Sequence, residues 1–88
     1  MMDQPRIATS IGRLFEFSES PYRFIVRLVS SEIDESVPVT EDMGRYIKVN
    51  FEVVDPRGSG LKVGEHFTVG QREIGPTYCW HARELDNQ

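Results

Sequence analysis

Cys79 and His81 are the first residues to consider for chemistry, because on a strand their side chains would share one face, two positions apart. A thiol beside an imidazole could form a nucleophile and its base, or half of a metal site. No third group accompanies them at the usual spacing, and His66 is the one other histidine. The sequence therefore favours a half-buried thiol beside a surface histidine, and we expect no enzyme activity, no metal site and no cofactor.

A second group of residues is suited to binding. Alternation along three strand-like segments places basic and polar side chains opposite the apolar face: Arg23, Arg27, Lys48, Asn50, Lys62 and His66. Arg, Lys and small polar groups make most protein contacts to phosphate, and aromatic rings such as Tyr46 and Trp80 could stack on unpaired bases. This pattern predicts a non-enzymatic module that binds single-stranded nucleic acid.

The acidic residues are concentrated in one segment, and they suggest an alternative function. The chain carries a net charge of −4, and five of its 14 acidic residues lie in a run without Lys or Arg: Glu32, Asp34, Glu35, Glu41 and Asp42. Pro38 lies in the middle of this segment and Gly44 at its end, so we expect a long loop at 31–44. Such a loop could be the contact surface of a protein-binding inhibitor or adaptor, for example a phage protein that docks on a host enzyme or a defence complex.

Period-2 alternation predicts the strands that would position these side chains. The segment "YIKVNFEV" carries the clearest pattern, with Ile47, Val49, Phe51 and Val53 on one face. The predicted strands are 11–17, 22–29, 45–55 and 61–69, and the last two are joined by the turn "DPRGSG". In the C-terminal segment 78–85, Tyr78, Trp80 and Ala82 have strand spacing, and a short helix from His81 is the alternative.

The length of 88 residues allows one domain. Residues 1–10 lack periodicity and predict a loosely ordered lead-in, and residues 11–88 predict a single small barrel of OB-like or SH3-like type. A two-layer α+β fold with one short helix is the alternative. Edge strands of so small a sheet could pair two copies into a homodimer.

The chain shows no apolar run long enough to cross a bilayer and no signal-peptide pattern, so we expect a cytoplasmic protein with no membrane partner. Its single cysteine cannot form an internal disulfide.

The segment from "YRFIVRLVSSEID" to "YIKVNFEVVDPRGSGLKVGEHFTVG" resembles the core of small phage proteins that bind single-stranded DNA. The resemblance covers about residues 22–69 and rests on strand alternation, a variable loop and a glycine turn. It implies an OB-type barrel that binds single-stranded DNA through its strands.

Overall fold

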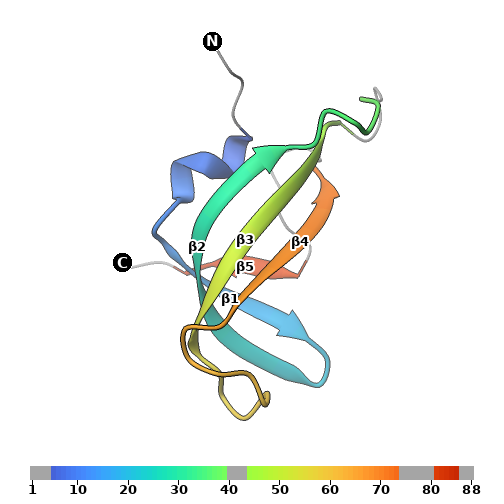
Figure 1. Cartoon of the computed structure of the whole chain (residues 1–88). Coiled ribbons are helices and arrows are strands. Elements are labelled where there is room, and N and C mark those ends of the chain that lie inside the picture. The colour runs from blue at the N-terminus through green and yellow to red at the C-terminus, as the bar shows by residue number, and fades with distance from the viewer. Residues whose placement is uncertain (1–4, 40–43, 74–80, 86–88) are drawn as a thin grey trace.

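The computed structural model describes residues 5–39, 44–73 and 81–85, which form one five-stranded antiparallel sheet (Figure 1). The elements are the 3-10 helix η1 (Arg6–Ser10) and the strands β1 (Leu14–Glu19), β2 (Tyr22–Ile33), β3 (Tyr46–Asp55), β4 (His66–Arg72) and β5 (Ala82–Glu84). The strand order is β4-β3-β2-β1-β5. The first four strands therefore each lie beside their neighbours in sequence, and β5 returns to the open side of β1.

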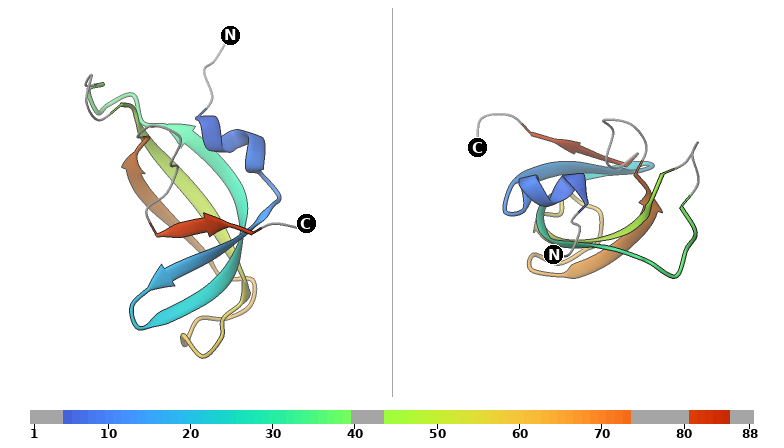
Figure 2. Two further views of the ribbon diagram at one scale, coloured as in Figure 1. Left: turned by 180° about the vertical axis from the view of Figure 1, so that it is seen from behind. Right: turned by 90° about the horizontal axis from the view of Figure 1, so that it is seen from above.

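The long strand β2 joins the two halves of the sheet. Its pairing with β3 is irregular between Ile25 and Val26 and again between Leu28 and Ser30. Such irregularities bend a strand and increase its twist. Figure 2 shows the result, in which β1 and β5 fold over the concave side of β3 and β4. Among the described residues β4 and β5 do not pair with each other, so the sheet is not closed into a barrel by backbone hydrogen bonds.

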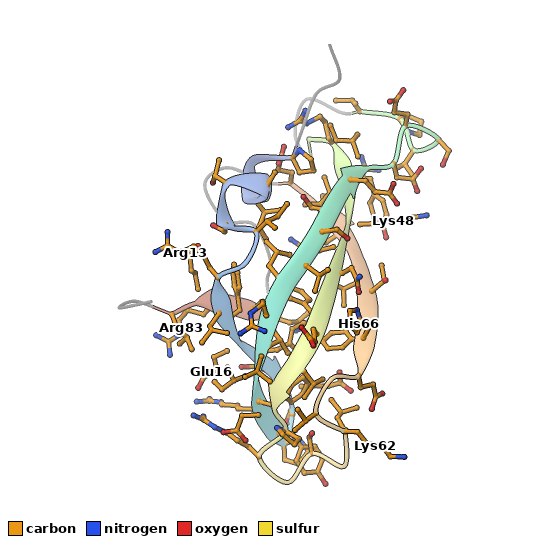
Figure 3. All side chains as sticks on the ribbon, turned by 60° about the vertical axis from the view of Figure 1, so that its left-hand side comes forward. Arg13, Glu16, Lys48, Lys62, His66 and Arg83 are labelled. Carbon is orange, nitrogen blue, oxygen red and sulfur yellow. The ribbon has the colours of Figure 1, made fainter. Side chains whose placement is uncertain are left out.

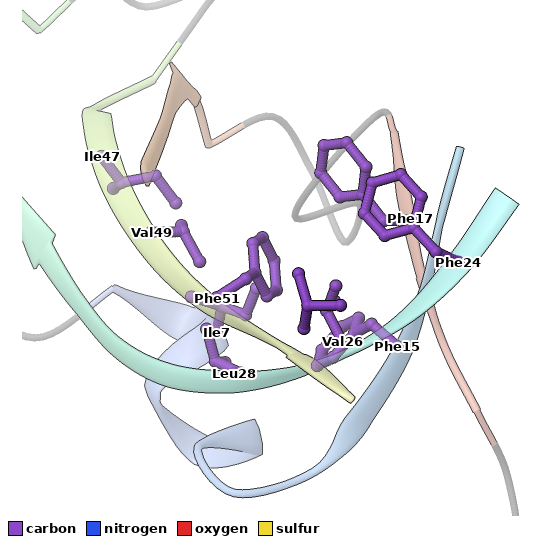
Figure 4. Packing of buried hydrophobic residues seen from close by; sticks show 10 residues of the cluster. Ile7, Phe15, Phe17, Phe24, Val26, Leu28, Ile47, Val49 and Phe51 are labelled. Atoms are coloured by element: carbon purple, nitrogen blue, oxygen red, sulfur yellow. The ribbon is translucent and has the colours of Figure 1, made fainter. Parts of the chain in front are cut away.

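The concave side of the sheet holds the hydrophobic core (Figure 4). It is built from alternate residues of β1, β2 and β3 together with Ile7 of η1: Ile7, Phe15, Phe17, Phe24, Val26, Leu28, Ile47, Val49, Phe51 and Val53. Phe17 of β1 contacts Phe67 of β4 with ring centroids 5.1 Å apart in a T-shaped arrangement. This aromatic contact thus joins the two halves of the bent sheet across the core.

The predicted strands at 22–29 and 45–55 are confirmed, and the predicted inward face of the second is confirmed in full. The first strand begins later than expected, at Leu14, because Gly12 has a φ of +92° and Ile11 is 48% exposed. β2 continues to Ile33, so the segment predicted as a loop at 31–44 begins inside a strand. This shift places Glu32 on the sheet.

The predicted strand at 61–69 is wrong at its beginning. β4 begins at His66, and residues 61–65 form a loop in which Val63 is 71% exposed. At the entry to the strand, Gly64 N donates to Val53 O and Val53 N donates to Glu65 O. Gly64 and Glu65 thus both lie opposite Val53, which is the pattern of a β-bulge. Leu61 packs against the core from this loop and Val63 is exposed, so the apolar spacing of these two residues does not mark a strand.

The two ends of the chain also differ from their predictions. The segment expected as a loose lead-in contains η1, and its Ile7 is fully buried against the sheet. At the C-terminal end, residues 82–84 form a strand, so the alternative of a helix beginning at His81 is wrong. The α+β alternative has no support in the described part of the chain, where η1 is the one helical element. Tyr78 and Trp80 lie outside the described residues.

Candidate interaction surface

The surface opposite the core, called the outer face below, consists of three cross-strand rows on β2, β3 and β4. The register of the sheet defines these rows as Arg27–Glu52–His66, Ser30–Asn50–Thr68 and Glu32–Lys48–Gly70. All nine residues are exposed or partly exposed. The tertiary structure therefore brings together four residues of the predicted nucleic-acid interface: Arg27, Lys48, Asn50 and His66.

Two of the remaining basic residues lie away from the outer face. Arg23 is on β2 beside Ser18 of β1, on the other half of the bent sheet. Lys62 belongs to the loop that precedes β4, and Figure 3 shows its side chain projecting away from the sheet. The predicted stripe is thus divided between three places.

The cations of the outer face are paired with acids. Arg27 lies 3.5 Å from the carboxylate of Glu52, and Lys48 Nζ lies 3.6 Å from Asp34 Oδ2. Glu32 is the register neighbour of Lys48 and adds a second negative charge beside it. A phosphate backbone would have to compete with these carboxylates, so the outer face has little net positive charge to attract it.

Tyr46 has a structural contact that restricts its use as a stacking group. A Cβ atom built on Gly70 would lie 2.3 Å from Tyr46 Oη, so the tyrosine side chain occupies the space above this glycine. The guanidinium of Arg72 lies 5.9 Å from the centroid of the same ring. One part of the ring is therefore already covered by residues of β4.

The predicted acidic loop is also partly committed to contacts within the domain. Ser36 donates two hydrogen bonds to Asp34 Oδ1, from its Oγ at 2.5 Å and from its backbone N at 3.0 Å. These bonds, with a further contribution from Lys48, lower the pKa of the Asp34 carboxyl below its usual range. Glu32 and Glu35 are exposed. Glu41 and Asp42 lie outside the described residues.

Of the predicted pair of Cys79 and His81, the structure describes only His81, because Cys79 lies outside the described residues. His81 is exposed, and its ring centroid is 6.2 Å from that of Phe17. Within the described ranges, no group of three or more potential metal ligands is present.

The sequence predicts edge strands but not which strands they are, and the structure places β4 at one edge of the sheet. Val53 N donates to Glu65 O before β4, and Glu73 N donates to Arg45 O after it, so the odd-numbered residues between them bond to β3. The backbone N–H and C=O groups of His66, Thr68, Gly70 and Arg72 then point away from β3. No strand of the described chain lies on that side.

Within the described residues, β4 itself carries few of the features that usually protect an edge strand against pairing. Exposed edges are commonly blocked by Lys, Pro, an acidic side chain or a bulge within the strand. β4 has the sequence "HFTVGQR", with Arg72 at its end as the one formal charge. The other edge strand, β5, has three residues, of which Arg83 and Glu84 are charged. β4 is therefore the edge on which an additional strand could add with least opposition.

An apolar hollow lies beside the first residues of β4. Its volume is about 220 Å³, and it is lined by Glu19, Tyr22, Phe24, Ser59, Leu61 and Phe67. Phe67 connects this hollow to the strand, and Tyr22 is 46% exposed. Because alternate residues of a strand point to the same side, a segment lying along β4 would direct some of its side chains to the concave side, where this hollow lies.

Comparisons with family models, curated proteins and solved structures give no match for this chain. In the portion of the chain that the structure covers, no helix has the length and apolar character needed to span a bilayer.

Proposed function

We propose that this chain is a non-enzymatic protein-binding module that accepts an extended segment of its partner as an additional strand on β4. The observation that carries this proposal is a row of alternate residues from His66 to Arg72, whose backbone groups point away from β3. In the described part of the chain no strand lies beside them. Strand addition uses such groups for affinity, and neighbouring hollows for side-chain specificity. The apolar hollow at Phe67 supplies a place for one side chain of the partner.

The strand order supports a half-open barrel of the SH3-like kind. Four consecutive strands lie side by side and β5 returns to β1, whereas an OB-type barrel has Greek-key connections. The Phe17–Phe67 contact holds β1 against β4 across the core, and β4 and β5 are not paired in the described part of the chain. A barrel left open in this way retains the edge of β4 for a partner.

A Thr68→Pro variant tests the proposal. The N–H of Thr68 points away from β3, so proline removes a donor that no backbone group of the described residues accepts. Proline is tolerated at such edge positions. Thr68→Ala keeps this N–H and is the matched control. We expect the wild-type and Thr68→Ala proteins to capture the same partner from an extract of the source cells, and Thr68→Pro to lose it while remaining folded by circular dichroism.

Amide hydrogen exchange on the purified complex then locates the contact. Strand addition should slow exchange at the amides of Thr68 and Gly70, which point away from β3 and have no backbone acceptor among the described residues. A partner that Thr68→Pro retains, or one that leaves these amides unprotected, would show that binding uses another surface.

Single-stranded nucleic acid remains the second candidate function. It is favoured by the uncharged row Ser30–Asn50–Thr68 at the centre of the outer face, flanked by Arg27 and Lys48. The ion pairs of both cations count against it. Fluorescence anisotropy of a labelled oligonucleotide separates the candidates: steeply salt-dependent binding that Arg27→Glu and Lys48→Glu abolish, and Thr68→Pro leaves intact, would favour nucleic acid.

A third candidate is a protein partner that binds the acidic loop, and variants of that loop distinguish it from the other two. Neutralising Glu32 and Glu35 should remove a partner that binds the loop, and should leave a partner that adds a strand to β4.

A further inference from the structure

We infer that the strand which β4 accepts belongs to a second copy of this chain, so that two domains join edge to edge about a two-fold axis at Val69. This inference rests on the proposed use of β4 as a strand acceptor and names the partner. Closed two-fold dimers are the commonest form of self-association among soluble proteins. In such a dimer the same patch of both copies must be complementary to itself, and the edge of β4 meets this condition.

The hydrogen-bonding register supports the two-fold axis. In an antiparallel pairing centred on Val69, His66 faces Arg72 of the second copy, and Thr68 faces Gly70 of the second copy. Each facing pair exchanges two backbone hydrogen bonds. In this register, the outward backbone groups of all four residues form hydrogen bonds to the second copy. A shift by one pair in either direction leaves an end residue without a partner, so the centred register makes the most bonds.

The side chains of β4 are compatible with this register. None of the seven residues is acidic, and the antiparallel direction separates the two Arg72 side chains by roughly 20 Å, at about 3.4 Å per residue. A parallel pairing would place the two arginines next to each other. On the outer face, Thr68 meets Gly70 of the second copy, which has no side chain of its own. Tyr46 of that copy covers this glycine, so its ring offers Thr68 a surface to pack against.

On the concave side, Val69 meets Val69 of the second copy at the axis. Val69 is partly exposed and packs against the margin of the core, so the pairing extends an existing apolar surface. The two sheets then form one continuous sheet, and the outer faces of both copies lie on the same side of it. β4 is already extended, and no described strand lies beside its outward backbone groups.

Sedimentation equilibrium over a concentration series is the first test. We expect the wild-type and Thr68→Ala proteins to shift from the mass of one chain to twice that mass as concentration rises. Thr68→Pro should keep the mass of one chain at every concentration. Circular dichroism and a thermal melt of Thr68→Pro verify that it remains folded. A wild-type protein that stays monomeric throughout, or a Thr68→Pro protein that still dimerises, would overturn the inference.

A disulfide tests the register. In a Cys79→Ser background, Val69→Cys should form a disulfide-linked dimer on oxidation. Val69 forms a non-hydrogen-bonded pair with itself, with Cα atoms about 4.5 Å apart, which is within disulfide range. Phe67→Cys is the matched control, because Phe67 faces Gln71 of the second copy and its own thiols are far apart. Equal cross-linking of the two variants would exclude this register.

The outcomes separate this inference from the proposed function. A monomeric protein that still captures another partner in a Thr68→Pro-sensitive way would overturn self-pairing and support strand addition. A dimer that is insensitive to Thr68→Pro, with no capture of any partner through β4, would overturn both.

Discussion

Individual charged residues on this domain lie close to opposite charges, and this determines what remains available for binding. Arg27, Lys48 and Arg83 each have a carboxylate within 4 Å, from Glu52, Asp34 and Glu16 respectively. Figure 3 shows Glu16 beside Arg83 on the half of the sheet formed by β1 and β5. Exposed pairs of this kind contribute little to stability, on the order of 0–1 kcal/mol each. Their main effect here is to reduce the positive potential of the surface.

Asp34 allows a prediction at the scale of one residue. Its pKa is lowered chiefly by the Ser36 hydroxyl, and to a smaller extent by Lys48. Ser36→Ala should therefore raise the pKa of Asp34 toward its ordinary value of 3.8, and should raise it more than Lys48→Ala does. Carboxyl chemical shifts followed by NMR during a pH titration measure both changes.

The sign of the linked stability follows from the lowered pKa. The folded state binds the Asp34 proton more weakly than the unfolded state, so the stabilisation is complete above the ordinary value and is lost as pH falls through the lowered one. Ser36→Ala should therefore reduce the decrease in unfolding free energy between neutral and acidic pH that is linked to Asp34. A larger effect from Lys48→Ala than from Ser36→Ala would contradict the assigned cause.

At the scale of elements, the ends of β3 and β4 are held together by a compact set of contacts. Arg45 bonds to the buried carboxylate of Glu73 through Nη2 at 2.6 Å and Nε at 3.1 Å. Arg72 donates from Nη1 to the carbonyl oxygens of Pro38 and Gly44. These contacts attach both sides of the loop between β2 and β3 to the end of the sheet.

Gly44 is the position where a substitution should disturb these contacts most. Its φ is +67°, and an added Cβ would lie 2.2 Å from the carbonyl oxygen of Glu73. Gly58 has a φ of +77° and open space around it, so it is the matched control. Gly58→Ala should cost about 1–2 kcal/mol of unfolding free energy from backbone strain, and Gly44→Ala should cost clearly more. Urea denaturation measures both variants, and equal losses would refute the steric argument.

At the scale of the whole molecule, the N-terminal segment helps to complete the core of the open sheet. Ile7 is fully buried, and the Ser10 hydroxyl donates to Glu84 on β5 at 2.7 Å. Arg13 forms an ion pair with the same glutamate at 3.0 Å. η1 and the residues that link it to β1 are therefore attached to both the core and the β5 edge of the sheet.

Ile7 and Ile11 form a matched pair for testing this role. Ile7→Ala removes a fully buried side chain and should lower the unfolding free energy by about 2–5 kcal/mol. Ile11 is 48% exposed, and Ile11→Ala should change it by no more than about 0.5 kcal/mol. Chemical denaturation of both variants compares them directly. Similar small losses would mean that η1 contributes little to the fold.

Local pattern determined the central strands of this protein and their inward faces. Ile47, Val49, Phe51 and Val53 alternate with polar residues, and burial of one face requires that alternation, so sequence alone predicts it. The same logic predicted that Arg27, Lys48, Asn50 and His66 would point away from the core.

Only the tertiary structure decided which of these side chains meet and which edge stays unpaired. β2 extends to Ile33 and bends, which brings Glu32 and Asp34 to Lys48; neither effect has a local signal in the sequence. The return of β5 to β1 instead of β4 left the edge from His66 to Arg72 without a strand beside it among the described residues. Strand pairing depends on contacts between residues distant in sequence, and for that reason the candidate site emerged from the fold.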